Sequence, residues 1–181
     1  MTTPTPTFPL DPGNIPALKH WLAEQNTGAR NVVAGASPAT TFLLPIDINE
    51  ILIGPDALLE LPAVLQRAGI TSGKHILLVM DETLMRRENH DLKPFIQALL
   101  SNADYNVKRL WLQGDSYGLV HADFEQVERV KAAIAPEMAL VALGSGTLTD
   151  IVKHAAYLYD AEHPEQSSIV YICCQTANSV T

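Results

Sequence analysis

The sequence is poor in the features that mark several common classes of protein. Its two cysteines, Cys173 and Cys174, are adjacent, so they cannot close an ordinary loop and offer no disulfide framework. No apolar run approaches the roughly 18 residues of a membrane span, and the N-terminus lacks the basic and apolar segments of a secretory signal. The sequence has only 12 basic residues and 20 acidic ones, and this negative balance argues against nucleic acid as a partner. We therefore expect a cytoplasmic protein that binds neither nucleic acid nor membrane.

The remaining composition is that of one globular domain. The chain has 181 residues, of which 47% are hydrophobic, enough to bury a core that offsets the entropy of ordering the chain. Residues 1–43 are predicted to lie outside that domain, as a proline-rich flexible arm, a short helix over 14–25 and a linker rich in small residues. The domain itself is expected to span residues 44–181.

Within that domain, apolar runs alternate with amphipathic segments. The runs predict strands at 47–53, 75–80, 107–112, 138–143 and 168–173, and the amphipathic segments predict helices at 56–68, 91–100, 122–134 and 149–159. This order is typical of an α/β fold with a doubly wound, mostly parallel, Rossmann-like sheet covered by helices on both faces. Such three-layer domains bind ligands at the carboxyl ends of the strands, where the strand order reverses.

The strongest candidate for a ligand site is the segment from Gly144 to Leu148, which joins a predicted strand to a predicted helix. Glycines let a phosphate approach bare N–H groups, and the start of a helix adds a partial positive charge. The hydroxyls of Ser145 and Thr147 add donors. The alternative is a tight turn without a ligand, in which Thr147 or Thr149 serves only as the N-cap. A G-S-G sequence alone does not decide between the two, because it is not the full G-x-G-x-x-G motif.

Two further sets of residues have a functional and a structural interpretation. Asp81 follows the predicted strand 75–80, where a carboxylate can accept hydrogen bonds from an adenosine ribose. It would also repel a 2′-phosphate, which favours NAD over NADP; the alternative is that Asp81 caps the next turn. Asp150 and Lys153 share a helix face, either as a surface ion pair or with Lys153 supporting the phosphate site from behind.

The run from Gly144 to Lys153 reads G-S-G-T-L-T-D-I-V-K. Together with Asp81, it resembles the N-terminal domain of the superfamily of iron-containing alcohol dehydrogenases, glycerol dehydrogenase, sn-glycerol-1-phosphate dehydrogenase and 3-dehydroquinate synthase. Members carry G-[GS]-G-x-x-x-D-x-x-K after a buried strand. The form found here is most similar to the glycerol-1-phosphate dehydrogenase branch, whose T-A-P-S type motif resembles residues 176–179, T-A-N-S.

The resemblance implies a role for each matching position. Asp81 would bind the adenine ribose, residues 144–148 would hold the pyrophosphate, and Thr176 and Ser179 would contact the nicotinamide side. The cofactor would be NAD or NADP, with NAD favoured. The full set of expected cofactor-binding residues is Asp81, Gly144, Ser145, Gly146, Thr147, Leu148, Asp150, Lys153, Thr176 and Ser179.

The resemblance also implies a second, helical domain with one Asp and two His that hold Zn, Fe or Ni. We expect the chain to be a piece that ends before this domain and is inactive alone, and we assign no catalytic or metal-binding residue within it. Two positions depart from the family. Thr181 stands where a substrate-binding Asp is frequent, and Gln175 where a proline is usual. The first departure weakens the case for glycerol or glycerol phosphate as the substrate.

The function expected from the resemblance is that of an NAD(P)-dependent, metal-dependent dehydrogenase, an oxidoreductase acting on an alcohol, a polyol or a polyol phosphate. A homo-oligomer is expected. The alternatives are a 3-dehydroquinate synthase-like cyclase that uses NAD transiently, and a binding module without catalysis. The cyclases usually carry G-G-G, so the G-S-G found here favours the dehydrogenase. Cys173 and Cys174 are predicted to be buried core thiols, with a reactive thiol at the cofactor cleft as the alternative, and Trp111 is predicted to lie in the core.

Overall fold

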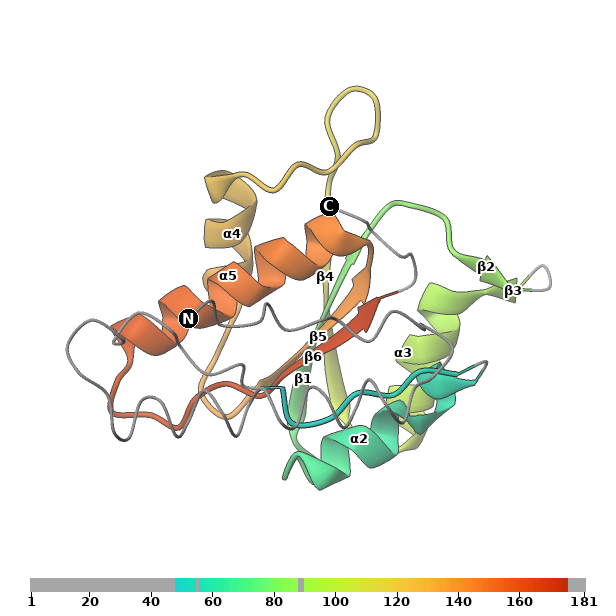
Figure 1. Cartoon of the computed structure of the whole chain (residues 1–181), viewed down its shortest axis with the longest axis vertical. Coiled ribbons are helices and arrows are strands. Elements are labelled where there is room, and N and C mark those ends of the chain that lie inside the picture. The colour runs from blue at the N-terminus through green and yellow to red at the C-terminus, as the bar shows by residue number, and fades with distance from the viewer. Residues whose placement is uncertain (1–47, 55, 88–89, 176–181) are drawn as a thin grey trace, which may run out of the picture. The chain divides into compact units, whose positions relative to one another are not determined.

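The computed structural model describes residues 48–54, 56–87 and 90–175. The chain divides into two units, Met1–Ala57 and Leu58–Thr181, and the sheet lies in the second. This sheet has four parallel strands in the order β4-β1-β5-β6 (Figure 1). The strands are β1 (His75–Asp81), β4 (Asn106–Leu112), β5 (Ala139–Gly144) and β6 (Tyr171–Gln175). The predicted domain boundary at 43/44 lies outside the described residues.

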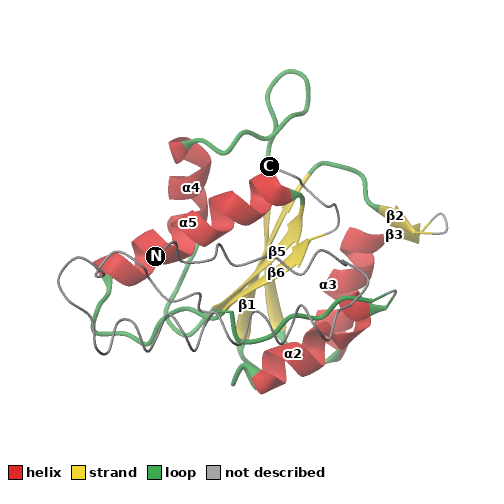
Figure 2. Cartoon of the chain, viewed as in Figure 1, coloured by secondary structure: helices red, strands yellow, loops and turns green. Residues whose placement is uncertain are grey.

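Helices cover both faces of the sheet, so the unit has three layers (Figure 2). They are α2 (Leu61–Arg67), preceded by the 3-10 turn η2 (Ala57–Glu60), α3 (Leu92–Asn102), α4 (Phe124–Lys131) and α5 (Gly146–Glu162). The helices α2 and α3 pack on one face, and α4 and α5 pack on the other. The predicted fold class, a doubly wound α/β sheet of the Rossmann-like type, is confirmed.

The central strand β1 contributes to the core on both faces. Successive side chains of a strand point to opposite faces. Accordingly Leu77 and Val79 pack with α4 and α5, whereas the alternate residues of β1 pack with α2 and α3. Both sets are almost completely buried. This two-sided burial explains why β1 reads in the sequence as a continuous apolar run.

Aspartate caps set the starts of two helices. The Asp91 side chain accepts a hydrogen bond from the Lys93 N–H at 3.1 Å, and Asp123 accepts one from the Gln126 N–H at 2.9 Å. These bonds satisfy backbone donors that have no partner inside the helix. The helix predicted at 149–159 begins earlier, at Gly146, and its N-cap is Ser145.

The strand predicted at 47–53 is wrong for the residues described. Residues 48–53 have no regular secondary structure, and Ile48 and Ile53 are at least half exposed. A strand requires a neighbouring strand, and no described strand pairs with this segment. Conversely, a short antiparallel pair, β2 (Arg86–Arg87) and β3 (His90–Asp91), was not predicted.

Two predictions about buried side chains are also corrected. Trp111 is 39% exposed, because it lies on the edge strand β4. Cys173 is exposed while its neighbour Cys174 is buried. The alternation of side chains along β6 separates the two thiols, since adjacent residues of a strand cannot face the same layer.

Candidate functional site

The strand order reverses between β1 and β5. The chain runs from β1 to its neighbour β4 and then crosses to β5 on the other side of β1. At such a reversal the connections leave in opposite directions and a crevice opens at the carboxyl ends of the two strands. Here Met80 of β1 pairs with Leu143 of β5, so the next residues, Asp81 and Gly144, end adjoining strands.

A pocket of about 330 Å³ lies at this reversal. It is lined by Asp81, Thr83, Leu84, Met85, Arg86, Leu92, Gly144 and Ser145. Three of the ten predicted cofactor-binding residues are therefore brought together around one cavity: Asp81, Gly144 and Ser145. They come from two strand ends that are 63 positions apart in the numbering but adjacent in the sheet.

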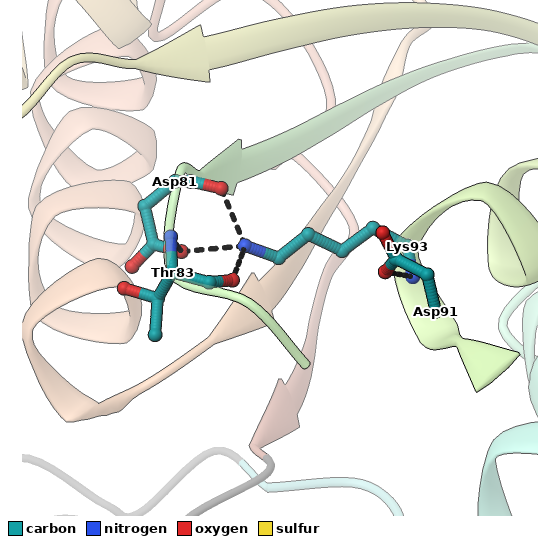
Figure 3. Close-up of polar contacts among 4 residues, drawn as sticks. All are labelled: Asp81, Thr83, Asp91 and Lys93. Atoms are coloured by element: carbon teal, nitrogen blue, oxygen red, sulfur yellow. Dashed lines mark hydrogen bonds and ion pairs between the residues drawn. The ribbon is translucent and has the colours of Figure 1, made fainter. Parts of the chain in front are cut away.

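Asp81 forms one wall of the pocket and is only 5% exposed. Its Oδ1 atom accepts a hydrogen bond from Lys93 Nζ at 2.7 Å and another from the backbone N–H of Thr83 at 3.2 Å. Its second carboxylate oxygen points away from Lys93 (Figure 3). The carboxylate is therefore held in a fixed orientation: Oδ1 is bound by Lys93 and the Thr83 N–H, and the second oxygen points away from Lys93.

Lys93 is the partner that fixes Asp81, and it is 3% exposed. Its ammonium donates to the backbone carbonyl of Asp81, to Asp81 Oδ1 and to the carbonyl of Thr83 at 2.5 Å (Figure 3). These three acceptors use all three ammonium protons. Lys93 Nζ also lies 5.5 Å from the centre of the Trp111 ring. The lysine thus attaches the start of α3 to the end of β1 and to the loop that lines the pocket.

Sequence reasoning missed Lys93, although a signal was present. Lys93, Ile96 and Leu100 are the buried residues of α3, and they follow the spacing of one helix face. A lysine on the apolar face of a helix needs a buried acceptor, because an unpaired ammonium is costly to remove from water. The carboxylate at the end of the neighbouring strand is that acceptor.

Gly144 has a packing role in the turn between β5 and α5. A Cβ atom added at this position would lie 2.6 Å from Leu148 Cδ2, far closer than atoms can approach. Leu148 itself is 1% exposed and belongs to the core. The absence of a side chain at Gly144 thus leaves room for Leu148 in the core, where the Leu148 side chain is not exposed to a ligand.

The N-terminus of α5 lies beside the pocket, because Gly144 and Ser145 line it and the helix begins at Gly146. The first hydrogen bond of the helix runs from the Thr149 N–H to the Ser145 carbonyl at 3.1 Å. The N–H groups of residues 146–148 therefore have no acceptor within the helix. The Ser145 side chain does not cap them. Within the described part of the chain they remain donors without a partner.

Of the remaining predicted site residues, Asp150 and Lys153 form an ion pair on the surface of α5. Lys153 Nζ is 2.8 Å from Asp150 Oδ1, and both side chains are more than half exposed, which is the surface ion pair considered above. Neither residue lines the pocket. Thr176 and Ser179 lie outside the described residues. Among the residues that the structure describes, no group of three His, Cys, Asp or Glu is placed to hold a metal ion, and no helix could span a membrane.

No protein-family model matches the chain, and no curated protein matches it in sequence. The family resemblance therefore stays a prediction that rests on the motif residues.

Proposed function

We propose that this chain is the nucleotide-binding part of an NAD(P)-dependent dehydrogenase that acts on an alcohol, a polyol or a polyol phosphate, similar to glycerol-1-phosphate dehydrogenase. One observation carries the proposal. A pocket at the reversal of the strand order adjoins unpartnered N–H groups at the start of α5. Anionic groups bind at helix N-termini because N–H donors and the helix dipole both favour negative charge.

The residues present fit the phosphates and the ribose of a dinucleotide. The N–H groups of residues 146–148 would hold the pyrophosphate, and the second oxygen of Asp81 would accept a hydrogen bond from the ribose. When bound, the nicotinamide supplies hydride transfer. The described residues of this chain bind and orient it. They do not fit a metal ion, so no step of the proposal depends on one here.

A binding experiment tests the proposal. Isothermal titration calorimetry with NAD⁺ and NADP⁺ should detect at least one of the two dinucleotides. Gly146→Val should weaken that binding by about tenfold or more, because a branched side chain would stand between the phosphate and the N–H groups. Gly146 is helical and its φ is not positive, so a valine at this position causes no left-handed backbone strain.

A matched control separates loss of the site from loss of the fold. Ser101→Val adds the same side chain at an exposed position in the last turn of α3 and should leave binding unchanged. Circular dichroism would establish that both variants are folded. If folded Gly146→Val binds dinucleotide as tightly as the unchanged protein, the phosphate site at α5 is wrong.

A second assay separates the dehydrogenase from the cyclase. The full-length protein, including the metal-binding domain that the resemblance implies, should form NADH steadily when it is supplied with divalent metal and a polyol or polyol phosphate, if it is a dehydrogenase. Release of phosphate without net NADH would favour the cyclase instead, because that chemistry oxidises and re-reduces one substrate on a single bound NAD. Absence of dinucleotide binding would leave only the binding module without catalysis.

A further inference from the structure

The charge of the pocket differs from the expectation based on Asp81 alone. A lone carboxylate at the end of β1 would repel a phosphate on the adenosine ribose. In the structure the carboxylate is paired with Lys93 at 2.7 Å, and both side chains are buried. At that distance the ammonium largely cancels the field of the carboxylate, so a second anion placed nearby is repelled only weakly.

Arg86 adds a second cation to the pocket. It lies on the short strand β2 and lines the cavity together with Asp81. Its neighbour across the β2–β3 ladder is Asp91, whose Oδ1 caps α3 by accepting the Lys93 N–H. Among the described residues, no hydrogen bond or ion pair engages the Arg86 guanidinium. It is therefore available to a ligand, and a guanidinium suits a phosphate because it offers parallel N–H donors.

We propose that this pocket accepts a phosphate monoester on the adenosine ribose, so that NADP binds more tightly than NAD. Arg86 is the residue that determines this specificity, and Lys93 is a positioning residue that neutralises and orients Asp81. The inference rests on the proposed function, and it reverses the preference for NAD that Asp81 suggested in isolation. Among the described residues that line the cavity, Asp81 and Arg86 are the charged ones, and the Asp81 carboxylate is paired with Lys93.

Calorimetry on the full chain tests this inference with NADP⁺ and NAD⁺, and with adenosine 2′,5′-bisphosphate and adenosine 5′-monophosphate as fragments. Each ligand that carries the 2′-phosphate should bind about tenfold more tightly than its partner. Arg86→Ala should weaken NADP⁺ binding by about the same factor and leave NAD⁺ binding within about twofold.

Arg87→Ala is the matched control. Arg87 is the next residue of β2, it is also exposed, and it is not among the residues that line the pocket. It should change neither affinity. Equal binding of NAD⁺ and NADP⁺, or equal effects of the two arginine variants, would overturn the inference while the proposed function stands. Absence of binding by any dinucleotide would overturn both.

Discussion

Two aspartates lie at or just after the carboxyl ends of neighbouring parallel strands, yet they have different surroundings. Asp81 ends β1, is buried, and is paired with Lys93. Asp115 comes shortly after β4 and is exposed. Its carboxylate accepts hydrogen bonds from the Tyr117 N–H at 2.8 Å and from the His121 ring at 3.0 Å.

The comparison shows that burial, rather than the presence of a partner, determines how much each charged pair contributes to stability. A buried ion pair lies in a medium of low dielectric constant, so either charge alone would be very unfavourable. An exposed pair is screened by water and salt. Asp81 therefore fixes a wall of the pocket, whereas Asp115 orders a surface loop. The hydrogen bond from His121, followed by those from backbone N–H groups, lowers the pKa of Asp115.

The largest expected effect is at the buried pair. Lys93→Met should lower the free energy of unfolding by about 3–5 kcal/mol, because it leaves Asp81 buried without its partner. The double variant with Asp81→Asn should recover part of that loss, since it removes both charges. Urea unfolding followed by circular dichroism measures each change.

Lys153→Met provides the control for that substitution. It makes the same replacement in the exposed pair with Asp150 and should cost less than about 1 kcal/mol. Equal destabilisation by the two lysine variants would contradict the distinction between buried and exposed pairs.

The exposed pair should show its effect in the acid range. Since the pKa of Asp115 is lowered below its ordinary value of 3.8, its stabilisation of the loop is complete above that value. The stabilisation is lost as the pH falls through the lowered pKa. The amide proton shifts of Tyr117 and Leu119, whose N–H groups donate to Asp115 Oδ1, should follow this titration by NMR.

Asp115→Ala should remove that titration from both amide signals without changing the fold of the sheet. A midpoint above 3.8 in the unchanged protein would mean that these hydrogen bonds do not favour the ionised form of Asp115. The arrangement of the loop would then need revision.

The smallest expected effect extends the comparison to β6, where adjacent cysteines differ. Burial raises the pKa of the Cys174 thiol to about 12, so it carries almost no thiolate at neutral pH. Cys173 is exposed. Iodoacetamide should therefore modify Cys173 in the folded protein and reach Cys174 only after unfolding, as peptide mass spectrometry would show. Equal rates of modification at the two thiols would contradict the burial seen along β6.

Much of the fold could be predicted from short-range patterns. The strands at 75–80 and 138–143 were located within about one residue, because two-sided burial requires an unbroken apolar run. The start of α3 was located because Asp91 can cap it locally. The strand predicted at 47–53 was wrong because an alternating pattern shows only that a segment could be a strand. It does not show that another strand is available to pair with it.

The candidate site divides in the same way. The carboxylate of Asp81 and the glycine-rich turn at residues 144–146 could be predicted from the sequence, because each is defined by one residue or by a few adjacent residues. The chain packing decides what those residues contact: Asp81 is neutralised by Lys93, and Gly144 contacts Leu148. The pairing of Asp81 with Lys93, and the position of Asp81 beside Gly144, depend on how separate strands and helices pack together. Local patterns therefore define the elements and the candidate residues, and only the packed sheet defines the charge and the walls of the pocket.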